Sequence, residues 1–300
     1  MQNFKLNEEF LLNNQDWTFP TFTAYGPGRF KEIGKFCKNF KINNALIVTD
    51  SGSVNLPFIS DLQNLLNDSK IKSDIYSNIS PNPRDDEIDS GCKKFREGNH
   101  DAIIAIGGGS AMDGGKAISL TVDSGVPLWD FEFEKEPPKL TMENPFPKII
   151  TIPTTAGTGA ETEVTAMVTH LEKGMKFCLW HPDARPCLAL VDPELTLKLP
   201  ANLTAWTGID AMIHAIEGYS VPMFHPLCDG SALESLNLIS KSLYAAVEEP
   251  DNLLARGGMI IGSYLGGIAF LKGLGLVHAI SHMVGACLLY TSPSPRDRIA

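Results

Sequence analysis

The sequence predicts an α/β domain, built as a parallel sheet with flanking helices, followed by an all-α C-terminal domain. In the first two thirds of the 300 residues, short apolar runs typical of buried strands alternate with amphipathic stretches typical of helices. From Leu203 onward the apolar periodicity is helical without interruption. A content of 43% hydrophobic and 20% charged residues is that of a globular chain with two ordinary domains.

The expected elements of the first half follow from these apolar runs and from the residues that interrupt them. Pro81-Asn82-Pro83 breaks the chain, and the acidic run DDEID then lies where a helix start favours negative charge. The expected elements are a strand at residues 43–50, a helix at 56–67, a strand at 73–77, a helix from DDEID to Gly98, a strand in HDAIIAIGGGS and a helix in AMDGGKAISLTV.

The pattern of apolar residues changes at DPELTLKLP, from strand-like runs to a helical period. The stretch 129–147 is rich in Pro, Glu and Lys and is expected to be a surface excursion, after which KIITIPTT resumes the sheet. We place an α/β domain at 1–195 and a helical domain at 196–286. The remaining expected elements are strands near 176–180 and 187–191 and helices at 204–219, 228–248, 252–270 and 275–286.

Composition excludes several classes of protein. With 25 Lys and Arg against 35 Asp and Glu, the net charge is −10 and the acids are scattered, which argues against nucleic acid as a partner. No uninterrupted apolar run approaches the roughly 18 residues of a membrane span, and the N-terminus lacks a signal-peptide pattern. The six cysteines form no C-x-x-C pair, so a disulfide framework is not expected. We therefore expect a cytoplasmic protein without a membrane partner.

A glycine turn joins a predicted strand to a predicted helix. Gly107, Gly108, Gly109 and Ser110 place unhindered backbone N–H groups at a helix start, where a diphosphate could bind. A strand-to-helix turn can also carry glycine for turning alone, but three in succession favour the phosphate role. The run is not the G-x-G-x-x-G fingerprint, so an ordinary Rossmann assignment fails.

Two further groups suit a nucleotide. Asp50 ends a predicted parallel strand and could accept hydrogen bonds from an adenosine ribose, where its charge would favour NAD over NADP, although it could equally be a turn former. The segment Pro153–Gly159 follows another strand and offers hydroxyls and glycines suited to lining a cleft.

Two predicted helices carry metal-ligand spacing. Asp210 and His214 are four residues apart, and His278 and His282 repeat that spacing on a helix that is otherwise small and apolar. A single buried histidine is more often a hydrogen-bonded core residue, but two such pairs favour a metal, and mixed imidazole and carboxylate donors suit Fe²⁺ or Zn²⁺. By spacing alone all four are candidate ligands. The other histidines, expected to be solvated, are His100, His170, His181 and His225.

Together these segments resemble the iron-containing (group III) alcohol dehydrogenase family. The resemblance rests on GGGSAMDGGKAI, PTTAGTGAETEVT, GIDAMIHAIEGY and GLGLVHAISHMVGA, in that order, and covers residues 22–286. It implies an N-terminal dinucleotide-binding domain, a C-terminal helical domain of dehydroquinate synthase-like architecture, and NAD(P) opposite a single divalent metal.

The resemblance also implies roles for individual residues. Asp210, His214 and His278 match three metal ligands, and His282 matches a catalytic histidine of the proton relay rather than a ligand. The cofactor-binding positions implied are Asp50, Gly107, Gly108, Gly109, Ser110, Asp113, Thr154, Thr155, Thr158 and Lys176.

The end of the chain departs from that pattern. The family's fourth ligand is a histidine in a P-H-G motif, whereas residues 289–293 read LYTSP and no histidine follows His282. The run CLLYTSPSPRD resembles a translated sequencing adapter, so we expect native sequence to end near Ala286, a non-native tail at 287–300, and an inactive or weakly active fragment. A divergent terminus is the alternative.

The expected activity is metal-dependent, NAD-linked hydride transfer between a small alcohol and its aldehyde, with Fe²⁺ as the metal, Zn²⁺ as the alternative, and NADP less favoured than NAD. The alternatives are a glycerol dehydrogenase-like zinc enzyme, a dehydroquinate synthase-like lyase, and an inactive nucleotide-binding fragment. A homo-oligomer is expected for the full-length protein.

Overall fold

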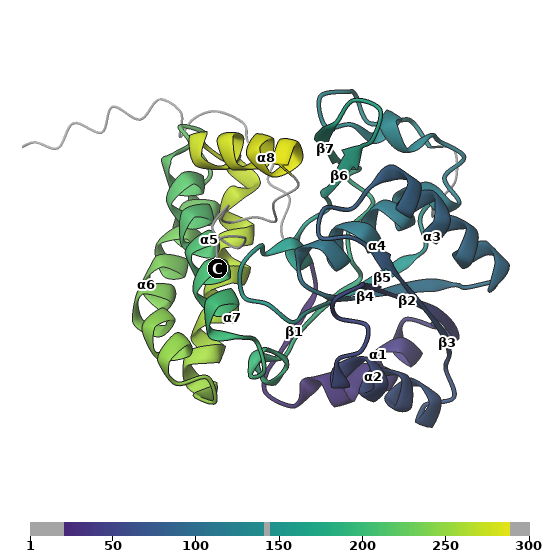
Figure 1. Cartoon of the computed structure of the whole chain (residues 1–300), viewed down its shortest axis with the longest axis horizontal. Coiled ribbons are helices and arrows are strands. Elements are labelled where there is room, and N and C mark those ends of the chain that lie inside the picture. The colour runs from purple at the N-terminus through teal and green to yellow at the C-terminus, as the bar shows by residue number, and fades with distance from the viewer. Residues whose placement is uncertain (1–20, 141–144, 289–300) are drawn as a thin grey trace, which may run out of the picture.

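The computed structural model describes residues 21–140 and 145–288. A six-stranded sheet is the centre of its first two thirds. The strand order is β1-β8-β5-β4-β2-β3, and every pair is parallel. Figure 1 shows helices on both faces of this sheet and a helical bundle beside it. The strands of the sheet are β1 (Thr23–Tyr25), β2 (Asn44–Asp50), β3 (Lys72–Ile79), β4 (Ala102–Gly107), β5 (Lys148–Pro153) and β8 (Leu188–Val191).

The central strand β4 reads AIIAIG and is buried along its whole length, as expected for a strand covered on both faces. One face is packed by α1 (Ile33–Asn39) and α2 (Pro57–Asp68), and the other by α3 (Asp85–Glu97) and α4 (Gly109–Val122). Because all its strands are parallel, their carboxyl ends meet at one edge, where the turns after β2, β4 and β5 lie together.

The helical part contains four longer helices, and all of them come from the sequence after β8. They are α5 (Ala201–Ser220), α6 (Pro226–Glu248), α7 (Leu253–Ala269) and α8 (Leu276–Leu288). Residues 253–272 are long and apolar enough to span a membrane by composition, but 67% of that window is buried inside the fold, as in a core helix. Packing against its neighbours therefore accounts for its apolar character.

The predicted strands and helices are confirmed with shifts of a few residues at their ends. Two short strands and one short α-helix were missed, namely β1, β6 (Ala166–His170) and α1. Strand β6 pairs with β7 (Met175–Leu179) in a two-stranded antiparallel sheet. The domain division at residues 195 and 196 stays a prediction. The expected tail lies outside the described residues from position 289, and α8 is described as far as Leu288.

Two expectations were wrong. The stretch 129–147 is not only a surface excursion, because Phe131 is 1% exposed and belongs to the core under the sheet. The histidines expected to be solvated are largely enclosed: His100, His181 and His225 are each below 9% exposed, and His170 stacks on Trp129 at 4.4 Å between ring centroids. For Phe131, His100, His170 and His181 a contact with a residue distant in sequence accompanies this burial.

Candidate functional site

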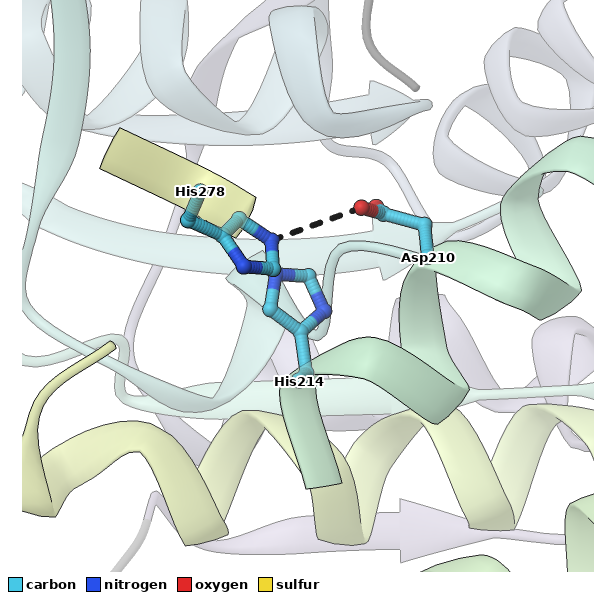
Figure 2. A group of neighbouring side chains, drawn as sticks. All are labelled: Asp210, His214 and His278. Carbon is cyan, nitrogen blue, oxygen red and sulfur yellow. Dashed lines mark ion pairs between the residues drawn. The ribbon is translucent and has the colours of Figure 1, made fainter. Parts of the chain in front are cut away.

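Three buried side chains from two helices meet at one point. Asp210 and His214 project from α5 and His278 from the first turn of α8, and one potential ligand atom from each lies within 4.8 Å of the others (Figure 2). His278 Nε2 is 3.5 Å from Asp210 Oδ1, and the two imidazole rings stack at 4.3 Å. One buried carboxylate and two buried imidazoles form a donor set for a transition-metal ion.

Both histidines are held through their Nδ1 atoms. His214 Nδ1 lies 3.3 Å from the carbonyl oxygen of Gly157, and His278 Nδ1 lies 2.5 Å from Glu217 Oε2. In metal sites the non-ligating nitrogen of a histidine is usually fixed in this way by a carbonyl or a carboxylate. The remaining nitrogen, Nε2, is thereby left for an ion in each ring.

The local charges follow from burial and mutual proximity. Burial opposes ionisation of Asp210, but His214 and His278 beside it outweigh burial and lower the pKa of its carboxyl. Burial lowers the pKa of His214. Asp210 as a carboxylate and His214 as a neutral imidazole are in the protonation states that bind metals. Burial acts in the same direction on His278, but Asp210 and Glu217 outweigh burial and raise its pKa, so an ion that binds there must displace a proton from this ring.

His282 lies one helical turn beyond His278 on α8. Its ring stands edge-on to the His278 ring at 5.7 Å between centroids, and it does not join the group of three. Burial, then the neighbouring His278, lowers the pKa of His282 to about 4. The spacing of four residues therefore does not place His282 with the other three candidate ligands, and the catalytic role that the resemblance implies for it stays a prediction.

The glycine turn joins β4 directly to α4, with Gly108 as the residue before the helix. Gly107 O accepts a hydrogen bond from Thr154 N at 2.9 Å, which holds the turn beside the end of β5. A Cβ on Gly109 would lie 2.6 Å from Thr158 Cγ2, so only glycine permits this close approach. The predicted turn and the Pro153–Gly159 segment are thus in contact.

Asp50 and Ser110 border the same turn, and each is already partly engaged. Asp50 Oδ1 accepts hydrogen bonds from Gly52 N and Ser53 N, while its Oδ2 points toward Gly107. The Ser110 hydroxyl donates to the carbonyl oxygen of Pro81 at 2.6 Å. Ser110 therefore offers an anion its backbone N–H rather than its hydroxyl.

A buried polar cluster extends from α4 to the β6–β7 hairpin. Lys116 is 1% exposed, with Nζ donating to Ala160 O at 2.8 Å and lying 3.7 Å from Asp113 Oδ1. Burial raises the pKa of Asp113 to about 6 against the opposing charges of Lys116 and Lys176. Burial also raises the pKa of Glu161 and of Glu163 to about 7.

Sequence reasoning placed Asp113 and Lys176 in the site but missed Lys116, Glu161 and Glu163. All three missed residues lie within the quoted motifs GGGSAMDGGKAI and PTTAGTGAETEVT. Glu217 was also missed, although it follows His214 by three residues and so lies on the same helix face. That spacing is the signal that could have found it.

Two family models match the chain. Residues 20–193 match the model described as iron-containing alcohol dehydrogenase, and residues 204–290 match the C-terminal model of the Fe-containing alcohol dehydrogenase family. Together they cover nearly all of the described residues.

Named relatives and solved structures agree with these models. The NAD-dependent methanol dehydrogenase of Bacillus methanolicus is 36% identical over 267 residues, covering 89% of this chain and 69% of that protein. The 1,3-propanediol dehydrogenase of Klebsiella pneumoniae is 33% identical, covering 93% and 71%.

Among solved structures, 1,3-propanediol oxidoreductase superposes with a TM-score of 0.86 at 33% identity, covering 94% of this chain and 72% of that one. Sulfoacetaldehyde reductase from Bifidobacterium kashiwanohense in complex with NAD⁺ gives 0.81 at 31% identity, covering 90% and 70%.

Proposed function

Because the chain belongs to the iron-containing alcohol dehydrogenase family, we propose that it transfers a hydride between a small primary alcohol and the nicotinamide of NAD. Membership makes the chain an oxidoreductase, and NAD is named both for the methanol dehydrogenase and for the structure of the sulfoacetaldehyde reductase. The substrate assignment to small alcohols and their aldehydes rests on the relatives, whose names include methanol and 1,3-propanediol.

We assign Asp210, His214 and His278 as the metal ligands. The donor set fits Fe²⁺, with Zn²⁺ as the alternative, because it combines one carboxylate with two imidazoles whose Nδ1 atoms are already occupied. A divalent ion held there supplies Lewis acidity, which lowers the pKa of an alcohol hydroxyl. The two helices contribute the rigid placement on which that chemistry depends.

We assign the turn after β4 as the site of the cofactor's diphosphate. Backbone N–H groups of Gly108, Gly109 and Ser110 open the α4 helix, where its dipole favours anions. The assigned neighbours of the cofactor are Asp50 on the ribose side, the threonines Thr154, Thr155 and Thr158 on the nicotinamide side, and Asp113 and Lys176 as further cofactor-binding residues.

One chain of contacts connects the two assigned sites and carries the proposal. The Pro153–Gly159 segment meets the glycine turn through Thr158 and Gly109, and its Gly157 carbonyl accepts from the His214 ring. A dinucleotide bound at the glycine turn and an ion bound at His214 would thus both lie next to residues held by the same short segment. Hydride transfer requires such proximity between the carbinol carbon and the nicotinamide.

His282 is assigned to proton transfer. It stands beside His278 without joining the ligand group, and both Lys176 and Asp210 act on it electrostatically. At that position its imidazole can accept a proton released on the substrate side and pass it outward. His282→Ala should therefore slow turnover while leaving metal affinity within a factor of about two.

The test combines binding with turnover. The purified chain should bind one Fe²⁺ or Zn²⁺ and bind NADH, and any NADH formed from a panel of short primary alcohols should disappear on chelation. Turnover that survives complete metal removal would refute the metal assignment. NADH binding that is unchanged by a bulky substitution in the glycine turn would refute the cofactor assignment.

Cytoplasmic location and a dimer or larger homo-oligomer are retained as parts of the proposal. The assembly can be measured by analytical ultracentrifugation of the full-length protein, and a monomer at micromolar concentration would contradict it.

A further inference from the structure

Glu217 is a buried carboxylate to which the assigned reaction gives no role. It lies on α5 and is 8% exposed. Its two oxygens have different partners: Oε2 lies 2.5 Å from His278 Nδ1, and Oε1 accepts a hydrogen bond from the backbone N–H of Val277 at 2.7 Å. One side chain of α5 thus contacts both the backbone and the histidine of α8.

The backbone contact falls at the start of α8. The helix begins at Leu276, so the N–H of Val277 belongs to the first turn and has no partner within the helix. A carboxylate at a helix N-terminus also interacts favourably with the helix dipole. Glu217 therefore acts as a capping group supplied by another helix, and it fixes where α8 begins relative to α5.

The side-chain contact determines which nitrogen of His278 is available. A carboxylate can only accept, so the atom facing it, Nδ1, carries a hydrogen. With Nδ1 engaged, Nε2 faces Asp210 at 3.5 Å, on the side where His214 also lies. Ring rotation or the opposite tautomer would turn the lone pair away from that side.

We propose that Glu217 is a positioning residue that docks α8 onto α5 and holds His278 with Nε2 directed into the metal site. This inference rests on the proposed metal site. This role of Glu217 requires both carboxylate oxygens, since each accepts a hydrogen bond from a different donor. Removal of either acceptor leaves a backbone N–H or an imidazole N–H without its partner.

Glutamine at position 217 tests the positioning role without changing the packing, because its side chain has nearly the same shape as that of glutamate. If its oxygen accepts from Val277 N–H, its NH₂ group faces His278 Nδ1 and favours the tautomer with hydrogen on Nε2. That tautomer cannot bind a metal through Nε2. Glu217→Gln should therefore weaken metal binding about 10- to 100-fold, the usual effect of losing an outer partner of a histidine ligand.

The experiment uses the purified chain and Co²⁺ alone, with affinity read from calorimetry and the ligand field from the visible absorption of bound Co²⁺. Wild type, Glu217→Gln and Glu234→Gln are compared, and the last serves as a control because Glu234 is an exposed carboxylate on α6. We expect weaker binding and an altered spectrum for Glu217→Gln only. Equal affinities and spectra for all three would overturn the inference.

A second measurement on the wild-type chain does not depend on how the variant folds. With Zn²⁺ bound, ¹⁵N-detected NMR of the His278 ring should place the hydrogen on Nδ1, and a hydrogen on Nε2 would overturn the inference. Absence of Co²⁺ and Zn²⁺ binding by wild type would instead refute the proposed metal site, and the inference with it. The two failures are therefore distinguishable.

Discussion

Replacing Glu161 with glutamine should stabilise the protein more at pH 8 than at pH 5. Glu161 is 2% exposed in the short helical turn Ala160–Thr162, beside the Pro153–Gly159 segment. Burial raises the pKa of its carboxyl from 4.5 to about 7, an effect that the charge of Lys116 only partly offsets. The folded protein therefore holds a proton on Glu161 that the unfolded chain releases.

The size of the effect follows from that difference in pKa. Because the pKa of Glu161 is higher in the folded state, its contribution to the free energy of unfolding is fully present below pH 4.5. It is lost as the pH rises toward 7. At about 1.36 kcal/mol per pKa unit, the loss at pH 8 is about 3 kcal/mol, against about 1 kcal/mol at pH 5. Glutamine mimics the protonated form, so Glu161→Gln should recover these amounts.

Urea denaturation of the metal-free and cofactor-free chain at pH 5 and pH 8, followed by tryptophan fluorescence at constant ionic strength, measures both values. Glu172→Gln provides a matched control, because Glu172 is exposed in the turn between β6 and β7. Its free energy of unfolding should change little at either pH. A gain for Glu161→Gln that is the same at pH 5 and pH 8 would refute the reasoning.

Asp50→Asn keeps an oxygen acceptor for the turn but removes the negative charge, so the affinity for NADPH should rise at least several-fold relative to the affinity for NADH. An unchanged ratio of the two affinities in fluorescence titrations would contradict the role of Asp50 in selecting NAD. Gly159→Ala should cost about 2–4 kcal/mol, since φ is +63° and a Cβ would lie 2.6 Å from Gly267 Cα. A loss below about 1 kcal/mol in urea denaturation would show that the backbone yields there. His278→Ala should lower Zn²⁺ affinity more than about 100-fold in calorimetry, and retained affinity would place the ion elsewhere.

The strands and helices that set the fold were predictable because their apolar periods are unambiguous. The β4 run AIIAIG has no polar residue, and the helical period persists after Leu203. The missed elements are short: β1 has three residues and α1 has seven. Such elements owe their conformation to neighbours, as β1 does to its pairing with β8, and not to a local pattern.

The candidate metal site was only partly predictable for a geometric reason. Spacing of four residues identifies a shared helix face, but it does not say how that face is directed toward another helix. On α5 both Asp210 and His214 reach the common point, whereas α8 approaches with its first turn and brings only His278 within reach. The partners on Nδ1, Gly157 and Glu217, come from other elements, so their contacts required the folded chain.

The Pro153–Gly159 segment explains how the two halves of the site can keep a fixed separation. Its last two residues face different elements: Thr158 packs against Gly109 of the glycine turn, and Gly159 lies against the backbone of Gly267 on α7. Immediately before them, the Gly157 carbonyl accepts from the ring of His214. The contact between Gly159 and Gly267 is made by backbone atoms, so it cannot adjust by a change of rotamer. Three consecutive residues, Gly157 to Gly159, therefore hold the glycine turn against the helices α5 and α7, and a substitution that moves their backbone should disturb both proposed sites together.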